Sequence, residues 1–134
     1  MLTTLDDLIH EARLQPVPQC LLFVLTRAEL PDLPTDKQRQ HVAKGEGGVL
    51  MPVLCVDKCP TEIDHMSDLV EESRLTGVDW DIALVAAMDH PGSDDVIETR
   101  LSHLVKAVQS GDIARMVAFD RNGDAIQLEK TGVY

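Results

Sequence analysis

Aromatic residues are scarce in this sequence, in which one Trp, one Tyr and two Phe make up 3% of 134 residues. A core must therefore be aliphatic, and the surface lacks the stacking side chains on which single-stranded nucleic acids bind. Basic residues are also few, 12 Lys and Arg against 23 Asp and Glu, which gives a net charge of −11 and a pI near 4.6. Because phosphate backbones attract basic surfaces, nucleic acid is excluded as a partner.

Long apolar runs are absent from the start of the chain, where Asp6, Asp7 and Glu11 fall within the first twenty residues. We expect neither a secretory signal nor a membrane span, and a cytoplasmic location. The three cysteines are an odd number, which fits free thiols in a reducing compartment. With 44% hydrophobic residues, residues 1–134 can form a single domain without a disulfide, a metal or a cofactor.

Apolar periodicity predicts alternating helices and strands. Helices are expected over residues 5–15, 35–45, 63–76 and 93–111, and unbroken apolar runs predict buried strands over residues 20–25, 49–56 and 82–88. Pro52 restricts the second strand to a strand start, a bulge or a sheet edge, and we expect its paired part to follow Pro52.

The end of the chain has a different pattern, since residues 116–119 and 125–128 flank Asn122 and Gly123, a strong hairpin signal. The predicted fold is therefore α/β: a single-domain mixed, largely parallel sheet of about five strands, with helices packed on it and a C-terminal β-hairpin.

Three sequence features resemble functional motifs and have simpler explanations. Residues 45–48 are glycine-rich, but they follow a helix and open a strand, whereas a phosphate loop follows a strand and opens a helix. Cys55 and Cys59 would lie ~13 Å apart on an extended strand, beyond the ~7 Å limit for a disulfide. The five histidines lie singly, without metal-ligand spacing. We therefore predict no metal site.

The acidic residues concentrate in residues 57–98, where twelve carboxylates accompany only Lys58 and Arg74, a local net charge of −10. Helix first turns favour anions, which accounts for several of them. Asp68, Glu71 and Glu72 fall on the face of a predicted helix away from its apolar residues, as a solvated face or a partner surface would.

Asp57 and Asp89 each follow a predicted strand, and in a parallel sheet both would lie at its carboxyl edge, where open α/β folds bind ligands. His90 is next to Asp89. Lys58 and Cys59 are next to Asp57, and the lysine could lower the pKa of the Cys59 thiol. These five residues are the candidate ligand-binding site, although charged residues after strands are also ordinary loop residues.

Segments along nearly the whole chain resemble a family of small proteobacterial proteins often labelled "ribonucleotide reductase subunit alpha". The segments are residues 19–24, 28–31, 45–48, 52–58, 69–74 and 118–123. The large subunit of that enzyme is several times longer and builds a barrel around a radical cysteine, which this chain cannot host. The resemblance implies a compact cytoplasmic bacterial protein and carries over no functional residue.

The sequence leaves three hypotheses. The first is a non-enzymatic accessory or interaction module whose acidic surface binds a basic protein partner. The second is a small-molecule or enzymatic site at the strand ends around Asp57 and Asp89. The third is a self-associating protein, a homodimer formed through the Pro52 strand or the final hairpin.

Overall fold

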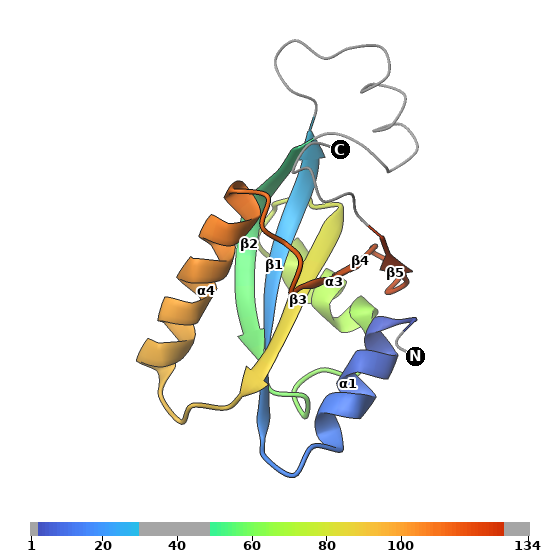
Figure 1. Ribbon diagram of the computed structural model, residues 1–134. Coiled ribbons are helices and arrows are strands. Elements are labelled where there is room, and N and C mark those ends of the chain that lie inside the picture. Colours follow the sequence, from blue (N-terminus) through green and yellow to red (C-terminus); the bar gives the residue numbers. More distant parts are fainter. Residues whose placement is uncertain (1–2, 30–48, 128–134) are drawn as a thin grey trace.

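The computed structural model describes residues 3–29 and 49–127, which form three helices and five strands (Figure 1). The helices are α1 (Leu5–Arg13), α3 (Met66–Arg74) and α4 (Asp94–Gln109). The strands are β1 (Gln19–Glu29), β2 (Val49–Lys58), β3 (Ile82–Asp89), β4 (Val117–Phe119) and β5 (Ala125–Ile126). The predicted helix over residues 35–45, the turn at 45–48 and the end of the hairpin at residue 128 lie outside the described residues.

The sheet is antiparallel throughout, so the prediction of a largely parallel sheet is wrong. The strand order is β2-β1-β3-β4-β5, and every neighbouring pair runs antiparallel. β2 and β3 do run in the same direction and are joined through α3, but β1 lies between them (Figure 1). Each of the two strands therefore pairs with β1, and β1 runs opposite to both.

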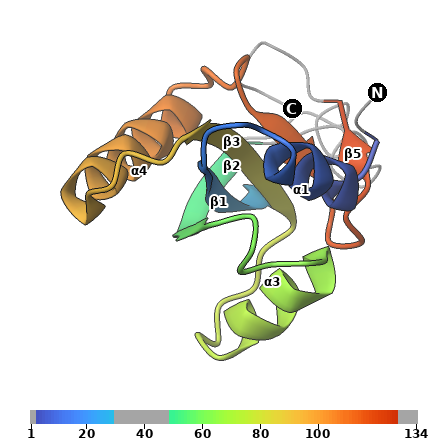
Figure 2. The ribbon, with the colours of Figure 1, turned by 90° about the horizontal axis from the view of Figure 1, so that it is seen from below.

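The apolar runs that favoured a parallel sheet reflect burial on both faces. α1 and α3 cover one face and α4 covers the other (Figure 2). Every residue of β1 from Cys20 to Thr26 is buried. A strand between two helical layers needs apolar side chains on both faces whatever the direction of its neighbours, so this pattern cannot distinguish parallel from antiparallel pairing.

The helices begin and face the core largely as their sequences predict. α1 is preceded by a capping box in which the Asp7 backbone N–H donates to Thr4 Oγ1 (3.2 Å) and the Thr4 backbone N–H donates to Asp7 Oδ2 (3.1 Å). Its buried residues, Leu5, Leu8, Ile9 and Ala12, have the i, i+3, i+4, i+7 spacing of one helix face, in agreement with the predicted helix over residues 5–15. No helix within residues 3–29 and 49–127 has the length and apolar character needed to cross a membrane.

Pro52 lies where the sequence allowed it. β2 is an edge strand, and its register with β1 shifts between Leu25 and Thr26, which pair with Leu54 and Pro52. Val53 is the extra residue of this β-bulge. The pairing continues on both sides of Pro52, from Val49 to Lys58, so the expectation that only the later part is paired is wrong.

Trp80 is the largest fully buried side chain, and it connects three segments of the chain. Its indole Nε1–H donates to Ser73 Oγ of α3 at 2.9 Å. The Arg121 guanidinium lies 4.9 Å from the ring centroid and donates to the Trp80 carbonyl oxygen at 3.0 Å. The single tryptophan thus joins α3, the start of β3 and the turn between β4 and β5.

The predicted hairpin is confirmed as β4 and β5, with a connection over residues 120–124. The Asp120 carboxylate accepts from the backbone N–H groups of Asn122 and Asp124, at 2.9 and 3.1 Å. The start of the chain runs beside this turn. The Leu5 N–H donates to the Gly123 carbonyl and the Ala125 N–H donates to the Thr3 carbonyl, both at 2.8 Å.

We predict that Gly123→Ala destabilises the protein more than Gly77→Ala. Both glycines have positive φ, +88° and +72°, which strains an L-residue by roughly 1–2 kcal/mol. A Cβ at Gly123 would lie 3.1 Å from Met66 Cβ, whereas one at Gly77 meets open space. The measurement is the free energy of unfolding in urea. Equal losses of stability in the two variants would contradict this prediction, because they would mean that the Cβ contact with Met66 costs no free energy.

Candidate functional site

The five strand-end residues of the candidate ligand site lie at one end of the sheet. β2 and β3 run in the same direction, so Asp57 and Asp89 both come near the start of β1 (Figure 1). Asp57 pairs with Leu22 and Asp89 pairs with Gln19. The two strands share this end because both are antiparallel to β1, and not because they are parallel neighbours.

The two carboxylates nevertheless lie on opposite faces of the sheet. Paired residues of neighbouring strands share a face, and successive residues alternate between faces. Asp57 therefore lies on the face of Leu22, which packs with α4. Asp89 lies on the other face with Gln19, whose Nε2 donates to Asp89 Oδ1 at 2.8 Å. The structure does not bring Asp57 and Asp89 into one cluster.

Lys58 is also separated from its neighbours in sequence. It pairs with Leu21 on the face of α1 and α3, and its Nζ lies 2.6 Å from Glu72 Oε2 of α3. The Lys58 side chain is only 18% exposed. The ammonium group of Lys58 thus forms an ion pair on the face of the sheet opposite to Asp57.

Cys59 lies in a tight loop closed by Glu62. The Cys59 N–H donates to Glu62 Oε1 at 2.8 Å, and the Glu62 N–H donates to the Cys59 carbonyl at 2.9 Å. The backbone N–H and the thiol of Cys59, as hydrogen-bond donors to the Glu62 carboxylate, are the main reason that the pKa of Glu62 is lowered, and the charges of Lys58 and His90 add to the effect. No sequence motif marks Glu62, whose carboxylate closes this loop.

Two thiols at this end of the sheet, those of Cys59 and Cys20, have raised pKa values. Burial first, and Glu62 second, raise the pKa of Cys59, opposite to the direction expected from Lys58. Burial and the charges of Asp57, Cys59 and Glu62 raise the pKa of Cys20 to about 11. A protonated thiol is a poor nucleophile and a poor metal ligand. Within the part of the chain that the structure describes, no three His, Cys, Asp or Glu residues are arranged to hold a metal ion.

The three cysteines should differ in their reaction with a thiol reagent at neutral pH. Cys55 is exposed, Cys59 is partly exposed with a raised pKa, and Cys20 is buried. We expect alkylation by iodoacetamide in the order Cys55, Cys59, Cys20, measured by mass spectrometry of timed digests. In unfolding concentrations of urea the three rates should converge. A native Cys59 that reacts faster than Cys55 would contradict the assigned environment.

The candidate partner surface, Asp68, Glu71 and Glu72, lies on the exposed side of α3. Each carboxylate also has a partner within the protein. Asp68 Oδ2 accepts from the Asp64 and His65 N–H groups at the helix start, Glu71 pairs with Arg74 at 2.8 Å, and Glu72 pairs with Lys58. The hydrogen bonds lower the pKa of Asp68. Part of this surface thus has a structural role.

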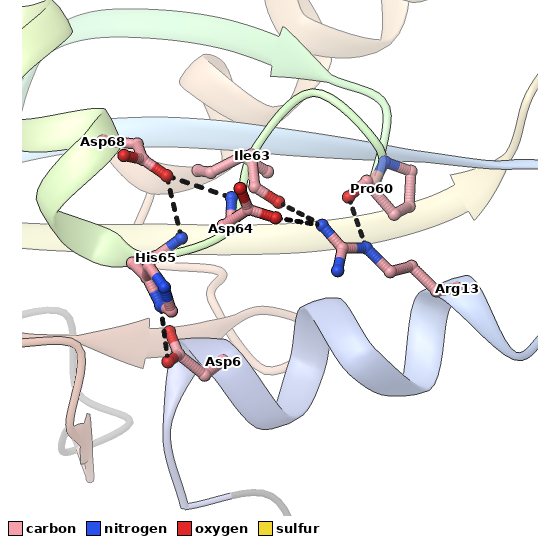
Figure 3. Close-up of polar contacts among 7 residues, drawn as sticks. All are labelled: Asp6, Arg13, Pro60, Ile63, Asp64, His65 and Asp68. Atoms are coloured by element: carbon pink, nitrogen blue, oxygen red, sulfur yellow. Dashed lines mark hydrogen bonds and ion pairs between the residues drawn. The ribbon is translucent and has the colours of Figure 1, made fainter.

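A polar contact that sequence reasoning missed joins α1 to the segment before α3 (Figure 3). The Arg13 guanidinium donates to the Pro60 and Ile63 carbonyl oxygens at 2.8 and 2.9 Å and to Asp64 Oδ1 at 2.7 Å. At the other end of α1, His65 Nδ1 lies 2.8 Å from Asp6 Oδ2. These partners are about fifty residues apart in sequence, and no local pattern links them.

We predict that Asp6→Asn lowers the pKa of His65. The hydrogen bond and charge of Asp6 are the main reasons that this pKa is raised above its usual value of about 6.5. A raised folded-state pKa means that the contact stabilises the fold at pH values below about 6.5 and that this contribution is lost as the pH rises through the folded-state value. An NMR titration of the His65 ring reports the shift. Asp94→Asn, a change at the start of α4, is the control and should leave the His65 titration unchanged.

Comparisons with known proteins give no family for this chain. No protein-family model matches it, no curated protein matches it, and no solved structure matches it.

Proposed function

We propose that this chain is a cytoplasmic, non-enzymatic interaction module that binds a basic protein partner through its acidic surface. One observation carries the proposal. All twelve carboxylate residues between Asp57 and Glu98 are exposed. Among the described residues, only three of the twelve have an ion-pair partner that is Lys or Arg: Asp64 with Arg13, Glu71 with Arg74 and Glu72 with Lys58. Most of the −10 charge of this block is therefore available to a partner.

The arrangement of the strand ends favours this proposal over a small-molecule site. Asp57 and Asp89 lie on opposite faces, and Lys58 is engaged by Glu72. The thiol of Cys59 has a raised pKa, which disfavours its use as a nucleophile. A ribonucleotide reductase catalytic subunit is also disfavoured, because a five-stranded sheet cannot surround a radical cysteine as that enzyme's barrel does.

The acidic surface is expected to act by attracting and orienting a partner, since complementary charge accelerates encounter and suppresses wrong partners. Such an interaction weakens with salt, because exposed charges are screened over about 10 Å at 0.1 M ionic strength. A buried, mainly apolar interface would respond far less.

We predict that Asp57→Asn with Glu98→Gln weakens partner binding roughly three- to tenfold, as expected for two exposed ion pairs. Both carboxylates are exposed and have no ion-pair partner among the described residues, whereas Glu71 and Glu72 are already paired with Arg74 and Lys58. The measurement is quantitative mass spectrometry of pull-downs from bacterial extract at low and at high ionic strength. Partners should be basic and should be lost at high salt.

The matched control removes two exposed carboxylates elsewhere, by Glu11→Gln with Asp112→Asn. This control reduces the net negative charge by the same amount and should leave binding within twofold of the parent protein. Partners that are acidic, that persist at high salt, or that respond equally to both double variants would contradict the proposal.

A further inference from the structure

β2 is an edge strand whose outer side is unpaired among the described residues. It pairs with β1 alone, from Val49 to Lys58. The other edge of the sheet differs, because Thr4 forms an antiparallel bridge with Asp124 beside β5, through hydrogen bonds from Leu5 to Gly123 and from Ala125 to Thr3. An unpaired edge presents backbone N–H and C=O groups on which a further strand can form.

The features that usually protect an edge are confined to one half of β2. Pro52 and the bulge at Val53 interrupt the first half. The second half, from Leu54 to Lys58, keeps a regular register with β1 from Leu25 to Leu21. Within the described part of the chain, this regular stretch of five residues therefore has no strand paired to its outer side.

Hollows lie on both faces beside this stretch, and Cys55 borders both of them. On the α3 side, a hollow of about 170 Å³ is lined by Leu54, Val56, Leu69 and Thr76 among others. On the α4 side, a hollow of about 500 Å³ is lined by Leu101, Val105 and Lys106 among others. Figure 2 shows α3 and α4 on opposite sides of the sheet. A strand laid against β2 would direct its alternate side chains into these two hollows.

The charges around the edge favour a basic occupant. Glu72 borders the hollow on the α3 side, Glu98 borders the one on the α4 side, and Asp57 lies on β2 itself. All three are exposed. The Lys58–Glu72 pair has no net charge, so the charges that remain at this edge are Asp57 and Glu98 against Lys106, which lines the larger hollow, and the edge is net negative. A second copy of the chain would bring another charge of −11 to this acidic edge, so a basic segment of a different protein fits better.

We infer that the β2 edge between α3 and α4 binds an extended, basic peptide segment by β-strand addition, with alternate apolar side chains in the two hollows. The inference rests on the proposed function and specifies where and in what conformation the basic partner binds. Backbone hydrogen bonds to Leu54–Lys58 would provide affinity, and the hollows and carboxylates would select the sequence.

The test begins with a phage-displayed library of random nine-residue linear peptides, selected on the full chain at low ionic strength. Selected peptides should combine Lys or Arg with alternating apolar residues. Bound peptide should slow amide hydrogen exchange in residues 54–58. Cys55→Lys places bulk and positive charge between the hollows, and it should weaken the measured affinity at least about tenfold. Ala114→Lys, at an exposed position outside both hollows, is the matched control and should leave the affinity unchanged.

The outcomes separate this inference from the proposal it rests on. Peptides that bind in a salt-dependent manner but protect only α3, and that tolerate Cys55→Lys, would overturn strand addition and leave the acidic docking surface standing. Peptides that protect residues 54–58 but lack basic residues would overturn the basic partner. Doubling of the mass in light scattering together with protection of residues 54–58 would make a second copy the occupant. An unsuccessful selection would overturn the inference.

Discussion

The pairing of β1 on both of its edges is the constraint on which the rest of this structure depends. β1 is buried on both faces from Cys20 to Thr26 and pairs with β2 on one side and β3 on the other. A strand in that position has no water to satisfy its backbone, so both neighbours are needed to satisfy its hydrogen bonds. Because both neighbours run opposite to β1, they run in the same direction as each other. The ends of β2 and β3 consequently lie at one end of the sheet.

Successive side chains of a strand alternate between its two faces, and this alternation determines which groups meet at that end. Asp57 and Lys58 are adjacent in sequence, yet one lies on the α4 face and the other reaches Glu72 on the α3 face. Cys59 is thereby left with a carboxylate from Glu62 as its hydrogen-bonding neighbour, and its pKa is raised. A cation next to a thiol in sequence does not activate it when the cation is held in an ion pair with another group, as Lys58 is with Glu72.

The two edges of the sheet differ in how far they are protected from pairing with another strand. At β5, the start of the chain covers the edge with two backbone hydrogen bonds, one that Leu5 donates to Gly123 and one that Thr3 accepts from Ala125. At β2, Pro52 and a bulge affect only the first half of the strand. This second edge is negatively charged, since exposed carboxylates of α3 and α4 flank it. Negative charge at an open edge also opposes self-pairing, because two copies repel each other.

The sequence by itself determined the local elements. The Thr4 and Asp7 capping box, the spacing of Leu5, Leu8, Ile9 and Ala12, and the Asn122-Gly123 turn act within a few residues, so their outcome could be predicted. Burial on both faces was also readable from the apolar run in β1. The Arg13 and His65 contacts could not be predicted, because their partners are distant in sequence.

Only the tertiary structure decided how the strands are ordered and which side chains share a face. A βαβ pattern leaves open whether a third strand is inserted between the two that it joins, and in this protein β1 is that strand. β1 runs antiparallel to both and so separates two strands that would otherwise pair in parallel, and its register with them places Asp57 and Asp89 on opposite faces. Register depends on the packing of all the layers together, and a shift of one residue would have exchanged the faces.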